Sequence, residues 1–237
     1  MEITASKESA IINGILHAMS ITEKDVIDDF KNSISKTNKN GLYPNVWARR
    51  SDDLESQFEM HSEIEVLHIE RTKLWQIDPV FDKENGNLYL LFSQPNLSRV
   101  RKRYITKGVS SHYSISFLLK NIGLLPMDGE NVELVPFTEE EIEKQHIKKN
   151  QEIEKMIGKY AELVKKVIMV SVSYHDGEAI AASLEEYTPN FELSAEVDLS
   201  DMLNVAYSGD TMMKDEETQS VELQEPLVKL KNNRKQN

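Results

Sequence analysis

The order of the two kinds of hydrophobic repeat along the chain limits its fold more than any other sequence feature. Apolar residues recur at helical spacing in the first 58 residues, as at Ile12, Ile15 and Met19. Short apolar runs typical of strands follow from Ile64 to Phe92. Because helices and strands come in successive runs and not in β–α–β alternation, we expect an α+β fold.

The N-terminal part is predicted to contain helices followed by a small antiparallel sheet. The expected helices cover Ser6 to Met19, a second segment after the cap Thr22, and Val46 to Phe58. The expected strands begin at Ile64, run from Leu74 to Phe81 and from Leu88 to Phe92, with Asn85-Gly86 in a turn between the last two. Two short helices are then expected, Asn96 to Tyr104 and one that begins near Ser111.

The rest of the chain is predicted to form a long central helix and a second small antiparallel sheet. The helix begins after Thr138 and extends to Val164. Asp176-Gly177 is typical of a hairpin turn between two β runs, and Phe191 to Val197 adds a third strand. We therefore expect three parts: residues 1–136, residues 137–208 and a flexible, polar C-terminal tail at residues 209–237.

Composition excludes several classes of protein. The chain has no cysteine, which removes disulfides, thiolate metal sites and cysteine nucleophiles. It has no run of about 20 apolar residues and no apolar signal-peptide core near Met1, so we expect a cytoplasmic protein that does not cross a membrane. The net charge of −12 opposes general affinity for nucleic acid unless positive charge is concentrated locally.

Such a concentration occurs at residues 87–127, which carry six basic side chains and no acidic one. Its densest part lies on the helix expected around Asn96 to Tyr104, away from the apolar Leu97 and Val100. The candidate anion- or partner-binding residues are Arg99, Arg101, Lys102, Arg103, Tyr104 and Lys107. They form a binding surface for an anionic partner, or alternatively they neutralise the chain's own acids, such as those at Glu139, Glu140, Glu141 and Glu143.

Other polar groups give weaker hypotheses. His61, Glu63 and Glu65 share one face of a strand, as metal ligands or simply as exposed polar residues. A second acidic group, Asp78, Asp82 and Glu84, has the composition but not the spacing of a metal-dependent nuclease site.

Neither serine chemistry nor a bound cofactor is indicated. Ser110, Ser111 and His112 are better explained by helix capping than by nucleophilic catalysis. Trp47 and Trp75 are expected to be core residues. Since no glycine-rich phosphate loop is present either, we expect no catalytic residue, no metal and no cofactor.

Several short segments resemble an uncharacterised protein family of low-GC Gram-positive bacteria and their phages and mobile elements. The matching segments are Asn40-Gly41-Leu42 with Trp47, Lys73 to Ile77, Asn87 to Phe92, His112-Tyr113 with Asn121, and Pro226 to Lys231. The resemblance implies a bacterial or phage setting, and it carries over no functional residue.

Together these observations favour a non-enzymatic protein–protein interaction module, such as a regulator or inhibitor that binds an acidic patch on a partner protein. The alternative is a nucleic-acid-binding protein or a metal-dependent nuclease that uses the basic segment. A pull-down from a natural host tests the first hypothesis, and a gel shift with a cleavage assay in Mg²⁺ or Mn²⁺ tests the second.

Overall fold

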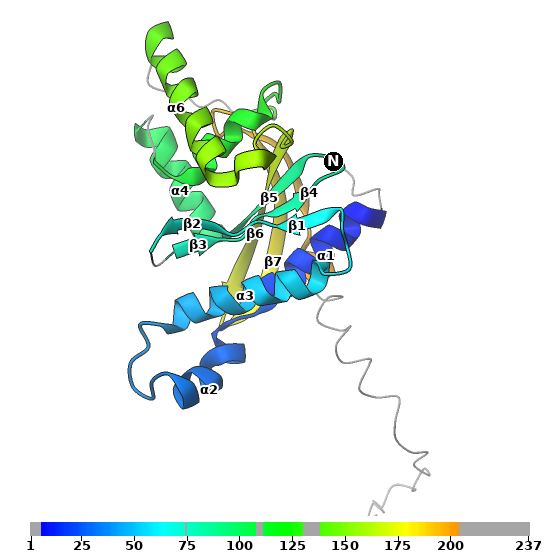
Figure 1. Cartoon of the computed structure of the whole chain (residues 1–237), viewed down its shortest axis with the longest axis vertical. Coiled ribbons are helices and arrows are strands. Elements are labelled where there is room, and N and C mark those ends of the chain that lie inside the picture. Colours follow the sequence, from blue (N-terminus) through cyan, green and yellow to red (C-terminus); the bar gives the residue numbers. More distant parts are fainter. Residues whose placement is uncertain (1–5, 74, 108–110, 130–137, 204–237) are drawn as a thin grey trace, which may run out of the picture.

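The structure is a computed structural model that describes residues 6–73, 75–107, 111–129 and 138–203. The tail expected at residues 209–237 lies outside these ranges. The predicted α+β class is confirmed, since the described residues form both α-helices and β-strands (Figure 1).

Three helices open the chain: α1 (Ser6–Ser20), α2 (Glu23–Ser33) and α3 (Leu42–Phe58). The cap of α2 forms as predicted, because the Thr22 side chain accepts a hydrogen bond from the backbone N–H of Lys24 and Asp25 accepts one from the Thr22 N–H. Helix α3 begins four residues before the expected Val46. Pro44 lies in its first turn, where a missing N–H removes no hydrogen bond within the helix.

Five short strands follow: β1 (Ile64–Val66), β2 (Ile69–Thr72), β3 (Trp75–Ile77), β4 (Val80–Asp82) and β5 (Asn87–Ser93). The prediction of one strand from Leu74 to Phe81 is wrong, because β3 and β4 belong to different sheets. Pro79 separates them and has no N–H to donate to a sheet. Its carbonyl instead accepts a hydrogen bond from the Leu67 N–H at 2.9 Å.

The next elements along the chain are α4 (Gln94–Lys107), α5 (Tyr113–Phe117), the 3-10 turn η1 (Leu118–Asn121), α6 (Glu139–Ile157), the 3-10 turn η2 (Gly158–Tyr160), β6 (Lys166–His175), β7 (Glu178–Tyr187) and β8 (Leu193–Asp198). Residues 200–203 are helical as well. The hairpin between β6 and β7 is confirmed, with φ angles of 50° at Asp176 and 73° at Gly177. Both are positive, as a type I′ turn requires. Helix α6 ends earlier than expected, before Gly158, whose φ of 49° is left-handed.

The expectation of two separate small antiparallel sheets requires correction. Six strands form one mixed sheet in the order β1-β4-β5-β6-β7-β8, and β2 and β3 form a separate pair. Strands β5 and β6 lie parallel and join the two halves of the chain, from Asn87 opposite Lys166 to Ser93 opposite Val172. Their central residues are apolar on both faces, which is typical of parallel strands covered on both sides by helices.

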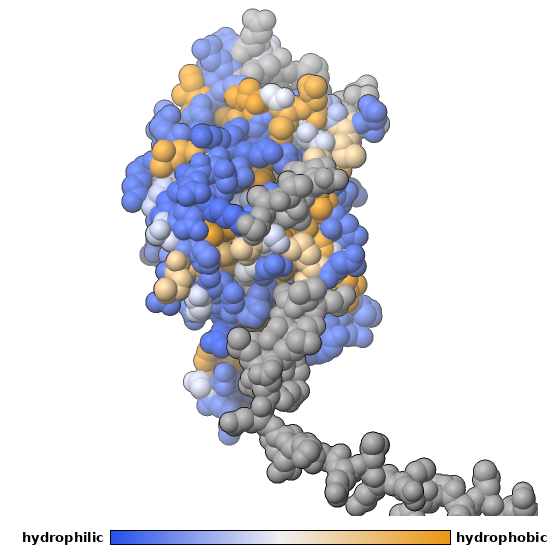
Figure 2. Space-filling model, turned by 90° about the vertical axis from the view of Figure 1, so that its right-hand side faces the viewer, coloured by the Kyte–Doolittle hydropathy of each residue, from blue (hydrophilic) through white to orange (hydrophobic). Residues whose placement is uncertain are grey.

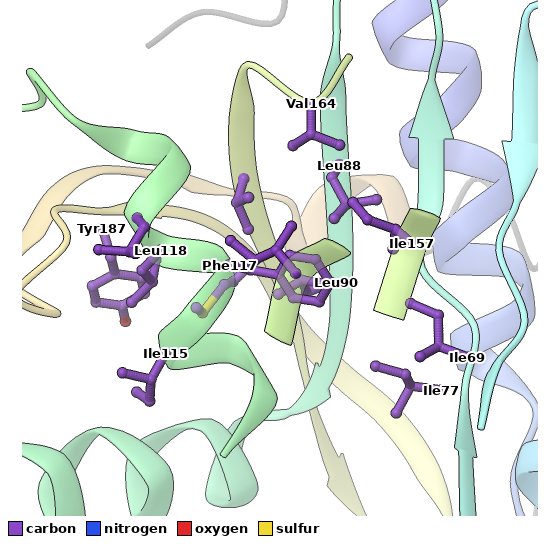
Figure 3. Packing of buried hydrophobic residues seen from close by; sticks show 14 of the residues in the cluster. Ile69, Ile77, Leu88, Leu90, Ile115, Phe117, Leu118, Ile157, Val164 and Tyr187 are labelled. Carbon is purple, nitrogen blue, oxygen red and sulfur yellow. The ribbon is translucent and has the colours of Figure 1, made fainter. Parts of the chain in front are cut away.

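Helices cover both faces of the six-stranded sheet, which therefore forms the middle layer (Figure 1). One face packs against α1 and α3. Gly14 lets these two helices lie close together, since a Cβ at this position would lie 2.7 Å from the Phe58 ring. The opposite face packs against α4, α5 and α6. Figure 3 shows this second cluster, in which Phe117 and Ile157 lie over Leu88 and Leu90 of β5.

A buried side-chain amide links η1, which lies in the connection between β5 and β6, to the sheet. The side-chain NH2 of Asn121 donates to the carbonyl oxygens of Val167 and Tyr187, at 2.8 Å each. Its carbonyl oxygen accepts a hydrogen bond from the Val167 N–H at 2.7 Å. Asn121 thereby satisfies buried backbone groups of β6 and β7 and fixes η1 against them.

The molecular surface is mainly hydrophilic on the side shown in Figure 2, with apolar residues visible in separate groups. Among the helices in the described ranges, none combines the length and the apolar character that a membrane span needs.

Candidate functional site on helix α4

Helix α4 carries the basic residues because its apolar positions repeat on one side only. Leu97, Val100 and Tyr104 are buried at i, i+3 and i+7 and hold the helix on the sheet. Most of the other positions therefore point toward solvent, whereas Arg101 and Ile105 are half-buried. Arg99, Arg103 and Lys107 follow one another at intervals of four residues, so this row extends over about 12 Å.

Four of the six candidate residues are exposed, namely Arg99, Lys102, Arg103 and Lys107. We refer to these four as the α4 basic surface. Within the described part of the chain, no carboxylate lies within 4.0 Å of their charged nitrogens. Arg99 donates a hydrogen bond to the side-chain oxygen of Asn96, a neutral partner, at 2.7 Å.

The alternative was that acids near residue 140 neutralise this surface, but those whose side chains are described form no ion pair with it. Glu140 pairs with Lys144 on its own helix at 2.6 Å. Glu143 is exposed. The side chains of Glu139 and Glu141 lie outside the described residues.

The other two candidates, Arg101 and Tyr104, are placed differently. Arg101 is half-buried, donates from Nε to the Phe191 carbonyl at 3.0 Å and lies 5.6 Å from the centre of the Tyr187 ring. Tyr104 is buried against Phe191, with the ring centres 6.1 Å apart, and burial raises the pKa of its hydroxyl. Its spacing from Leu97 puts it on the apolar side of the helix, not at the edge of the basic surface.

A pocket of about 400 Å³ lies beside the basic surface, between α4 and strands β7 and β8. We call it the α4–β7 pocket. One wall carries Arg101, Lys102 and Ser98, and the opposite wall is formed by Glu185, Tyr187 and Leu193. A volume of 300 Å³ or more is of the order that small-molecule sites occupy.

The carboxylate of Glu185 is the most unusual polar group in this pocket, because only 9% of the residue is exposed. It accepts hydrogen bonds from Ser171 Oγ at 2.7 Å and from the Tyr187 hydroxyl. Burial raises the pKa of Glu185, with a further increase from Glu196, its cross-strand neighbour on β8. The two hydrogen bonds and the charge of Arg101 oppose this increase only in part.

Sequence reasoning missed Glu185. The only signal was a series of polar residues at alternate positions of the two strands, at Ser171, Ser183 and Glu185, on a face that otherwise carries core residues. Only the pairing of β6 with β7, and the position of α4 above them, bring Glu185 to the same pocket as Lys102.

The other acidic candidates each have a partner close by. Glu63 lies 3.3 Å from His61, and Glu65 accepts from Tyr160 and lies 3.3 Å from Lys83. No cluster of three or more His, Cys, Asp or Glu side chains in the described ranges is arranged to hold a metal ion.

The acidic residues compared with nuclease sites are separated in the same way. Asp78 accepts from Gln76 at 2.6 Å and lies 2.8 Å from His68. Although burial lowers the pKa of His68, hydrogen bonds and charges from Asp78 and Glu55 raise it overall. Asp82 is buried, lies 3.0 Å from Lys7 and accepts from the Asn85 side chain at 2.6 Å, so it organises the turn before β5.

The two tryptophans lie in one aromatic cluster. The rings of Tyr43 and Trp75 are nearly parallel, with centres 6.3 Å apart, and Trp47 meets both edge-on. The Arg50 guanidinium lies between Trp47 and Tyr174, at 4.8 and 5.2 Å from the ring centres. Both tryptophans are half-buried at the margin of the core: Trp47 packs against the cluster between the sheet and helices α1 and α3, and Trp75 against the cluster on the opposite face.

A comparison with protein families gives one result. The family model described as "Family of unknown function (DUF5986)" matches residues 4–237. Searches of curated proteins and of solved structures gave no match.

Proposed function

The chain belongs to DUF5986, a family of unknown function, and we propose that it is a non-enzymatic interaction protein whose α4 basic surface binds an acidic segment of a partner protein. One observation carries this proposal. Arg99, Lys102, Arg103 and Lys107 are exposed on a single helix without a carboxylate partner in the described residues, in a chain of net charge −12.

The size of the surface favours a short acidic protein segment over nucleic acid. The row from Arg99 to Lys107 spans about 12 Å, and salt screens exposed charges beyond about 8 Å at physiological ionic strength. A short peptide can stay within this area. A nucleic acid extends its phosphates beyond it, toward a protein whose residues outside 87–127 carry a net charge of −18.

The test compares two anionic probes by fluorescence anisotropy over a range of salt concentrations. One is a labelled poly-glutamate peptide and the other is a single-stranded oligonucleotide of equal charge. We expect the peptide to bind more tightly. Reversal of the surface by Arg99→Glu, Lys102→Glu, Arg103→Glu and Lys107→Glu should weaken its binding about tenfold or more at low salt.

A matched variant controls for net charge. Lys36, Lys39, Lys148 and Lys155 are also exposed and lie on other elements, so their replacement by Glu changes the total charge equally. This control should bind the peptide far better than the α4 variant does. Equal loss in both variants, or tighter binding of the oligonucleotide than of the peptide, contradicts the proposal.

The proposal includes the setting that the sequence resemblance implies. We place the protein in the cytoplasm of low-GC Gram-positive bacteria or in their phages, as a regulator or inhibitor of the partner. The corresponding experiment in cells recovers the partner from such a host. We expect the α4 variant to lose the partner and the matched control variant to retain it.

A further inference from the structure

The α4–β7 pocket has opposite charges on its two walls. Arg101 and Lys102 supply positive charge from α4. Glu185 supplies negative charge from the sheet side, and Glu196 lies opposite it on the neighbouring strand β8. A ligand with a single charge would meet repulsion from one wall, whereas a ligand with both charges would meet attraction from each.

Apolar groups lie between these walls. Leu97 and Ile105 from α4 and Leu193 from β8 line the pocket, together with the ring of Tyr187. The ring is fixed, because its hydroxyl donates to Glu185 and Arg101 lies over its face. Most small-molecule sites combine an apolar lining of this kind with a few placed polar groups.

The geometry points to a binding site in the α4–β7 pocket for a small zwitterion of the amino-acid class. The carboxylate of the ligand would lie toward Lys102 and Arg101, and its ammonium group toward Glu185. This site is separate from the docking function of the α4 basic surface, although Lys102 contributes to both.

Glu185 also gives this site a pH signature. The groups that face it are Ser171 of β6, Tyr187 of β7, Glu196 of β8 and Arg101 of α4. Burial raises the pKa of Glu185 in the free protein, and a ligand ammonium would lower it again. Binding should therefore release protons and become tighter as the pH rises through the pKa of Glu185.

The experiment uses the full chain and the twenty free amino acids, screened by ligand-observed NMR and followed by calorimetry. We expect at least one of them to bind with a Kd of about 1 mM or below. Two blocked forms of that amino acid should each bind about tenfold more weakly. They are the N-acetyl form, which lacks the ammonium group, and the amide, which lacks the carboxylate. Calorimetry in buffers of different ionisation enthalpy measures the released protons.

Glu185→Gln separates this site from the docking surface, and Lys102→Glu provides a second variant of the pocket. Glu185→Gln should weaken amino-acid binding about tenfold, remove the proton release and leave poly-glutamate binding unchanged. Lys102→Glu, on the exposed wall, should also weaken amino-acid binding, which covers the case in which the Glu185 variant does not fold. Lys36→Glu is the control.

Three outcomes overturn the inference. They are the absence of binding by any amino acid at 10 mM, equal binding of the N-acetyl form, and binding that Lys102→Glu does not change.

Discussion

At the scale of single residues, the protonation state of His112 makes the N-terminal cap of α5 depend on pH. Its ring nitrogen Nδ1 accepts from the backbone N–H of Ser114, and the Ser114 hydroxyl lies 2.9 Å away. Burial, together with the charges of Arg71 and Arg99, lowers its pKa from 6.5 to about 4. His112 is therefore mainly neutral in the folded protein at neutral pH, and the cap depends on that neutral form.

This shift predicts a loss of stability in acid. Because the folded pKa lies below the unfolded value, the contribution is complete above pH 6.5 and declines as the pH falls toward 4. Asn at position 112 keeps an acceptor for the cap and does not titrate. Between pH 7 and pH 5, urea unfolding should show wild type losing up to about 2 kcal/mol more than His112→Asn. An equal loss in both proteins would remove His112 as the cause.

The residue scale also shows the limits of sequence reasoning about the site. Helical spacing was sufficient to place Arg99, Lys102 and Arg103 on the outer side of α4. It could not indicate that Arg101 would bond to the Phe191 carbonyl 90 residues later. Sequence reasoning could not predict Glu185 as a site residue for the same reason, since its position in the pocket depends on contacts between distant segments.

At the scale of elements, the turn before β5 joins two distant segments. Gly86 has a φ of 76°, and its carbonyl accepts from the N–H groups of Lys165 and Lys166, at 2.8 and 3.2 Å. A Cβ at this position would lie 2.7 Å from the Leu163 carbonyl oxygen. The turn therefore needs glycine both for its backbone conformation and for the close approach of the chain that leads into β6.

Gly86→Ala should consequently destabilise the protein more than a comparable substitution without the close contact. Gly158 provides that comparison, since its φ is 49° and nothing lies within 4 Å of an added Cβ. We expect a loss of about 1 kcal/mol for Gly158→Ala and at least about 1 kcal/mol more for Gly86→Ala in denaturant unfolding. Equal losses would mean that the approach of Leu163 adds no strain.

Local sequence patterns predicted single helices and turns better than they predicted which strands pair in the sheet. The cap at Thr22 and the hairpin at Asp176-Gly177 depend on residues next to one another, and both are confirmed. The parallel pairing of β5 with β6 joins segments about 79 residues apart, from Asn87 to Lys166, and no local pattern encodes it. The expectation of two sheets failed for this reason.

At the scale of the whole molecule, the six-stranded sheet extends across the boundary that was expected near residue 136. Strands β1, β4 and β5 precede this position, and β6, β7 and β8 follow it. Both helical layers also pack on strands from each half. A sheet of this kind cannot lose one half without exposing the core of the other.

We therefore expect one cooperative unfolding transition. Trp47 and Trp75 are the only tryptophans, so fluorescence reports on the part before residue 136. Hydrogen exchange at the amides of β7 reports on the part after it. Both probes should give the same denaturant midpoint. A fluorescence transition that is complete while β7 amides stay protected would show that the two halves unfold independently.

The central claim is that an acidic protein segment binds to the α4 basic surface, and chemical labelling of lysines tests it most directly. Lys102 and Lys107 belong to that surface, while Lys36 and Lys39 are exposed elsewhere. At saturating poly-glutamate peptide, the labelling rates of Lys102 and Lys107 measured by mass spectrometry should fall several-fold, with Lys36 and Lys39 unchanged. An equal decrease at all four lysines, or protection of Lys36 and Lys39 alone, would contradict the claim.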